Sequence, residues 1–173
     1  MLTTKYKIAK FIAYGLLAAL LCVLQNTPGL FVLWEVKPML VAAFAVCVAF
    51  FERETAGGLF AIWCGFLCDL MSAYTFGFYM LSLFVLCVAV GLLTQGFMSR
   101  VSANAVLFTL VAMLMIQGVA FFFVFFIRSV PDSGGYFLRQ MLPMSLYTAA
   151  TALLLYYPTR WLHNYFQTLI DAA

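Results

Sequence analysis

The stretch GGLFAIWCGFLCDLMS, residues 57–72, is almost wholly apolar and carries a single charge at Asp69. Small residues occupy every fourth position at Gly57, Ala61 and Gly65, and Asp69 continues the same spacing. Residues four apart share one face of an α-helix, and small side chains on that face let a second backbone approach closely. The stretch therefore predicts a membrane helix that lies centrally in a bundle.

Asp69 is the only formal charge between Glu54 and Arg100. A charge at such depth costs about 2.5–3.5 kcal/mol on insertion scales and usually faces protein rather than lipid. Three roles are open: a solvated residue at the helix end, a structural anchor, or a proton or ligand site. We expect the anchor, bonded to neighbouring N–H or hydroxyl groups, with Ser72 and Thr75 as candidate partners.

The composition of the whole chain agrees with a membrane protein. Of its 173 residues 66% are hydrophobic and 9% are charged, whereas a soluble domain carries roughly 25% charged residues. So few charges could not solvate the surface of a water-soluble fold, and no basic patch suggests nucleic acid. We predict one transmembrane domain over residues 1–173, with the five cysteines buried as small apolar residues.

Apolar runs of about 20 residues indicate spanning helices. We predict an all-α polytopic membrane protein with six spans at residues 8–24, 38–51, 57–72, 77–97, 103–127 and 141–157. The second and third runs are short, so a re-entrant hairpin is an alternative for that pair. Either arrangement returns the chain to the same side of the membrane.

Basic residues predict the orientation, because cytoplasmic loops are enriched in Lys and Arg. With both ends inside, six basic residues lie on the inner side and three on the outer side. The inner set is Lys5, Lys7, Lys10, Arg53, Arg100 and Arg160, and the outer set is Lys37, Arg128 and Arg139. Aromatic residues typical of membrane interfaces fall near predicted span ends at Trp34, Tyr74, Tyr136 and Trp161.

Residues 159–171 alternate apolar and polar side chains with the period of a helix. We expect a separate amphipathic helix in the inner interface, with a docking face for a partner helix as the alternative. The only histidine, His163, falls on its polar face and is expected to be an ordinary interfacial residue. No catalytic constellation, metal-ligand spacing or phosphate loop is recognisable. Glu52, Arg53 and Glu54 form an inner turn that is either solvated or a partner contact.

Several of these features together resemble the rod shape-determining protein MreD family of bacteria. They are Lys37-Pro38 before a short apolar run, Glu52-Arg53-Glu54, Gly57-Gly58, the segment 65–72 with Asp69, and Gly77 eight residues after the aspartate. The resemblance covers about residues 36–97. One departure is Ala61, where the family often has glycine, but a small residue is kept.

The resemblance implies a non-catalytic scaffold without cofactors in the bacterial cytoplasmic membrane. Its implied partners are the bitopic protein MreC, membrane lipid, and the cell-wall elongation machinery of a SEDS polymerase, a class B penicillin-binding protein and, indirectly, MreB. The implied fold is similar to that of the substrate-binding subunits of energy-coupling factor transporters. On this view Pro38, Gly57, Ala61, Gly65, Asp69 and Gly77 are packing residues, and Glu52, Arg53 and Glu54 are candidate partner contacts.

A vitamin-binding subunit of an energy-coupling factor transporter is the main alternative. Such subunits resemble one another in an Ala-x-x-x-Ala face on the first span, which Ala9 and Ala13 could imitate. A small-molecule site should also show convergent polar groups, and the predicted spans hold few beyond Asp69, Asn104 and Gln117. A membrane enzyme is a third and weaker interpretation.

Overall fold

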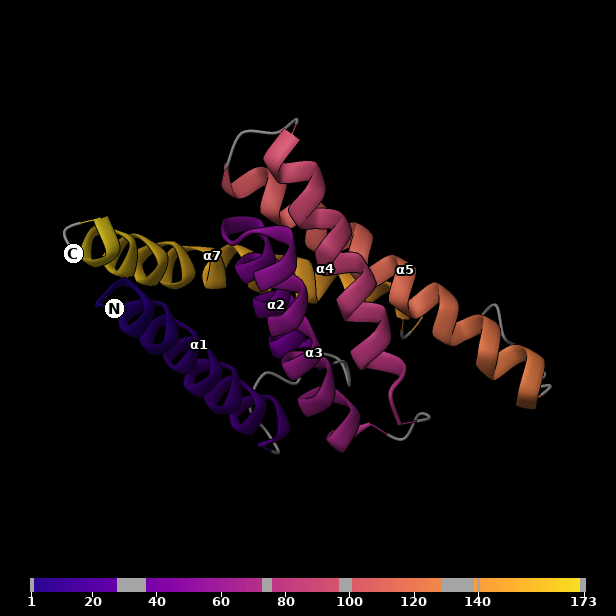
Figure 1. Ribbon diagram of the computed structural model, residues 1–173. Coiled ribbons are helices and arrows are strands. Elements are labelled where there is room, and N and C mark those ends of the chain that lie inside the picture. The colour runs from indigo at the N-terminus through magenta and orange to yellow at the C-terminus, as the bar shows by residue number, and fades with distance from the viewer. Residues whose placement is uncertain are drawn as a thin grey trace.

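The chain forms a helical bundle in a computed structural model that describes residues 2–27, 37–72, 76–96, 101–128, 139 and 141–171. Its helices are α1 (Leu2–Asn26), α2 (Leu40–Phe51), α3 (Glu54–Met71), α4 (Phe78–Gly96), α5 (Ser102–Arg128) and α7 (Leu142–Asp171). No strand occurs in these ranges. Figure 1 shows the two termini side by side at one end of the bundle. The predicted all-helical class is therefore confirmed.

Four helices are long and apolar enough to cross a membrane, namely those containing Lys5–Asn26, Glu54–Met71, Phe78–Gln95 and Ser102–Phe123. These segments match the first, third, fourth and fifth predicted spans within a few residues. α2 has only 12 residues, which at 1.5 Å each gives about 18 Å. That is well below the roughly 30 Å thickness of the hydrocarbon core.

The centre of the bundle is α2, not α3, so the prediction of a central third span is wrong. No residue of α2 is more than 5% exposed, and α1, α3, α4, α5 and α7 all pack against it. A helix that is apolar all round is buried on every side, and the sequence LVAAFAVCVAFF meets that condition. α3 is buried only on its small-residue side and leaves Leu59, Trp63 and Leu70 exposed.

The C-terminal part is one helix rather than a span and a separate tail. α7 runs without a break through Pro158, although a proline inside a helix costs about 3 kcal/mol. The half beyond Pro158 is held by tertiary contacts, because His163 lies against Phe51 with ring centroids 5.5 Å apart. In Figure 1 this yellow end of α7 lies beside the start of α1.

Some of the remaining predictions are confirmed, and others concern residues outside the described part of the chain. All five cysteines are free and buried, as expected. Pro38 is buried just before α2. The side chains of Trp34, Tyr74, Thr75, Arg100 and Tyr136 lie outside the described part of the chain.

Candidate functional site

Asp69 caps the N-terminal end of α4. Its Oδ2 accepts hydrogen bonds from the backbone N–H groups of Gly77 at 3.1 Å and Met80 at 3.0 Å. Its Oδ1 accepts one from the N–H of Tyr79 at 3.0 Å. The first N–H groups of a helix have no partner within the helix, and a carboxylate there also meets the positive end of the helix dipole. The expected anchor role is thus visible in the geometry: Asp69 is 4% exposed, and all of its hydrogen-bond donors among the described residues are backbone N–H groups.

The expectation that Ser72 is a hydrogen-bond partner of Asp69 is wrong. Its hydroxyl oxygen is buried without a hydrogen-bond partner in the described structure. Gly77, rather than Ser72, provides a hydrogen bond to Asp69. Its backbone φ of +96° is a conformation that residues with a side chain disfavour. That conformation, directly before the first residue of α4, leaves the Gly77 N–H bonded to Asp69.

The small residues of α3 lie between two neighbouring helices. A methyl group added at Gly57 would lie 2.9 Å from the Cα of Ala49 on α2. One added at Gly65 would lie 2.3 Å from the Cα of Met80 on α4. Ala61, between them, is fully buried. The predicted packing face is therefore real, and it joins α3 to α2 at one level and to α4 at another.

A second cluster joins α1, α7 and the turn between α2 and α3. The Glu52 Oε1 lies 2.5 Å from the Lys10 Nζ and 3.0 Å from the His163 Nδ1. It also accepts a hydrogen bond of 3.3 Å from the Tyr14 hydroxyl. Lys10 is only 3% exposed, so these contacts provide the partner that a buried charge requires.

This cluster corrects several expectations. Glu52 is not the solvated turn residue that was one of two expectations for it, and His163 is not merely an interfacial polar residue. Burial raises the pKa of the Glu52 carboxyl, but hydrogen bonds and charge from His163 and Lys10 outweigh it and leave the pKa below its ordinary value. Of the other turn residues, Glu54 accepts a hydrogen bond from Gln95 of α4, and Arg53 is exposed.

A cavity of about 530 Å³ opens beside the cluster. Its wall includes Lys7, Arg53 and His163, together with apolar residues such as Phe11 and Ala56. A basic and partly apolar cavity at the end of a helical bundle can receive an anionic group that carries a hydrophobic part.

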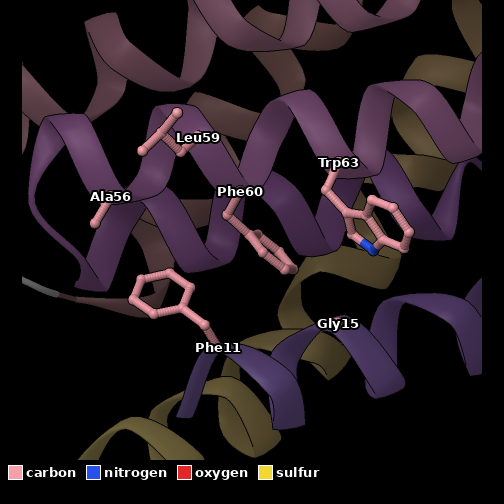
Figure 2. A pocket seen from close by; sticks show the side chains of 6 residues that line it. All are labelled: Phe11, Gly15, Ala56, Leu59, Phe60 and Trp63. Atoms are coloured by element: carbon pink, nitrogen blue, oxygen red, sulfur yellow. The ribbon is translucent and has the colours of Figure 1, made fainter. Parts of the chain in front are cut away.

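A groove of about 450 Å³ continues between α1 and α3. Figure 2 shows Phe60 and Trp63 reaching from α3 toward α1, while the Phe11 ring reaches from α1 toward α3 and lies near Ala56. Gly15 adds no side chain at this level, and its Cβ position would lie 3.9 Å from the Trp63 Nε1. Phe11 and Ala56 line both the groove and the basic cavity, so the two spaces adjoin.

The sequence pattern found the Asp69 region but missed the cluster around Glu52. The aspartate was visible as an isolated charge in an apolar run, whereas Lys10, Glu52 and His163 stand 42 and 111 residues apart along the chain. The only available signal was the position of all three on the side predicted to be cytoplasmic. Among the described residues, no group of three His, Cys, Asp or Glu side chains could hold a metal ion.

Comparisons with models of protein families, with curated proteins and with solved structures found no match to this chain.

Proposed function

We propose that the protein is a non-catalytic scaffold of the bacterial cell-elongation complex, similar to the MreD family. It would lie in the cytoplasmic membrane with six spans and both ends inside, bind an MreC-like bitopic protein, and help organise peptidoglycan synthesis. α7 would then cross the membrane in addition to the four long apolar helices, and α2, which is shorter than the hydrocarbon core, would cross where the bundle thins the bilayer. The resemblance of residues 36–97 motivates this role, and the geometry of the same residues supports it.

The supporting observation is that the residues carrying the resemblance build a joint between helices. Both oxygens of Asp69 are engaged by backbone N–H groups of α4. Gly65 is in contact with the backbone at Met80. A proton or ligand site needs a polar group that can still bind something else, and this carboxylate is committed to structure. Such a joint suits a protein whose task is to hold a shape that partners recognise.

The transporter alternative requires polar groups that converge on a ligand. Asp69 caps α4, and Gln117 donates a hydrogen bond to the Met144 sulfur at 2.9 Å, so these two candidates have structural partners. Gln117 is also only 3% exposed. These observations favour the scaffold over a vitamin-binding subunit.

Affinity co-purification tests the proposal. The full chain would be co-expressed with the MreC-like protein of the same bacterium, and with an unrelated single-span protein as the control. We expect a stoichiometric complex with the former that survives size-exclusion chromatography in detergent. Recovery equal to that of the control would reject the scaffold role. A vitamin-sized molecule bound at one per chain, detected after denaturation by mass spectrometry, would support the transporter instead.

A further inference from the structure

We propose that the basic cavity and the adjoining groove together bind one anionic phospholipid. The headgroup phosphate would lie against Lys7 and Arg53, and one acyl chain would follow the groove between α1 and α3. This site is independent of the scaffold proposal, because it rests on the lining of the two spaces.

The charge of the cavity is the first observation. Lys10 and Glu52 compensate each other in the wall, and Glu54 turns to Gln95 of α4 instead of lining the cavity. Lys7 and Arg53 are exposed at the cavity and form no salt bridge within the described residues. Lys7 is an uncompensated positive charge in the lining, and Arg53, whose charge acts on the neighbouring Glu54, adds a second that no salt bridge among the described residues neutralises. The positive end of the α3 dipole lies at the same place, because α3 begins directly after Arg53.

The continuity of polar and apolar space is the second observation. Lys7, Phe11 and Gly15 follow one another at intervals of four, which puts them on one face of α1. Lys7 and Gly15 are eight residues apart, or about 12 Å along the helix axis. One leaflet contributes about 15 Å to the hydrocarbon core. The two spaces therefore fit a headgroup and the upper part of one acyl chain, and the rest of that chain would extend into the leaflet.

The lining favours a lipid chain over the helix of a protein partner. Membrane helices associate through small residues that allow close approach. The groove is lined mainly by the bulky side chains of Phe11, Leu59, Phe60 and Trp63. Leu59 and Trp63 are 67% and 46% exposed, so flexible apolar chains can reach them from the bilayer.

Native mass spectrometry of the detergent-purified full chain provides the test. Phosphatidylglycerol and phosphatidylcholine with identical acyl chains would be titrated separately, with sn-glycerol 1-phosphate as a soluble competitor. We expect one phosphatidylglycerol per chain with clear preference over phosphatidylcholine, and no displacement by the soluble phosphate. The double variant Lys7→Gln/Arg53→Gln should bind about 30-fold more weakly, since each basic residue near an anionic surface contributes roughly fivefold.

A matched control separates the site from general charge. Lys5→Gln/Arg160→Gln removes two exposed basic residues of α1 and α7 that do not line the cavity, and it should bind like the wild type. Gly15→Leu should fill the groove and weaken the binding of phosphatidylglycerol, while the elution volume of the protein stays unchanged.

Three results of the binding experiments would overturn the proposal. They are equal binding of the two lipids, equal loss in the two double variants, and full displacement by sn-glycerol 1-phosphate. A photo-crosslinker at Leu59 that reacts with a protein partner instead of lipid in native membranes would also overturn it, and would assign the groove to a helix.

Discussion

At the scale of single residues, Asp69 shows how a charge can be accommodated inside an apolar bundle. Among the described residues it accepts hydrogen bonds from three backbone N–H groups, that of Gly77 directly before α4 and those of Tyr79 and Met80 in its first turn. Because these N–H groups have no helical partner of their own, one carboxylate satisfies donors that would otherwise be buried unpaired. The neighbouring Ser72 hydroxyl, buried without a partner among the described residues, provides a contrast within the same turn.

Substitutions at Asp69 should therefore be graded. Asp69→Asn retains one oxygen, which can still accept hydrogen bonds from the N–H groups of Gly77 and Met80. The hydrogen bond from the Tyr79 N–H would be lost, so we expect partial loss of folded protein. Asp69→Leu leaves all three N–H groups unpaired, at about 1–3 kcal/mol each, and should abolish most folded yield. The measurements are the amount of protein in the monodisperse peak in detergent and the midpoint of its thermal unfolding. Ser72→Ala is the control and should equal the wild type; an Asp69→Leu variant as stable as Ser72→Ala would refute the capping role.

The lowered pKa of Glu52 predicts that the thermal stability of the protein depends on pH. Its pKa is lowered in the folded protein, so its contribution is present above the ordinary glutamate pKa of about 4.3 and is lost as pH falls through the folded pKa. The thermal midpoint of the wild type should exceed that of Glu52→Gln above about pH 5.5. The difference should shrink as pH falls below about 4.3. A difference that does not change between pH 7 and 3.5 would contradict this assignment.

At the scale of elements, close packing between α3 and α4 depends on glycine at three levels. A methyl group at Gly91 of α4 would lie 2.8 Å from the Cα of Glu54, and one at Gly58 of α3 would lie 2.6 Å from the Val88 side chain. The approach at Gly65 is the tightest of the three and meets backbone. Backbone cannot rotate away as a side chain can, so the helices themselves would have to separate.

Two alanine substitutions test this packing. Gly65→Ala should lower the thermal midpoint strongly, because its methyl group would overlap Met80 backbone atoms at 2.3–2.7 Å. For Gly118→Ala on α5, no atom of the described residues lies within 4 Å of the added methyl group. It should be neutral or slightly stabilising, since alanine favours helix over glycine by about 1 kcal/mol. Equal effects of the two substitutions would show that α3 and α4 do not approach this closely.

At the scale of the whole molecule, the proposed orientation places both termini in the cytoplasm. The Lys10 Nζ lies 3.1 Å from the His163 Nδ1. This contact brings the start of α1 and the end of α7 to the same end of the bundle. Reporter fusions after Thr168 should therefore be active with a cytoplasmic reporter and inactive with a periplasmic one. The opposite pattern would reject the six-span orientation, whether α2 and α3 cross fully or form a hairpin.

The amino-acid pattern alone was enough to predict an all-helical chain with helices apolar enough to cross a membrane, most helix bounds, and the small-residue face that ends in Asp69. These features depend on composition and on spacing within one helix, where side-chain position follows from the period alone. Tertiary structure decided that α2 is central, that α7 continues through Pro158, and that Asp69 binds the backbone of α4. It also brought Lys10, Glu52 and His163 together. The physical reason is that partners from distant segments are selected by the packing of whole helices, which no local pattern contains.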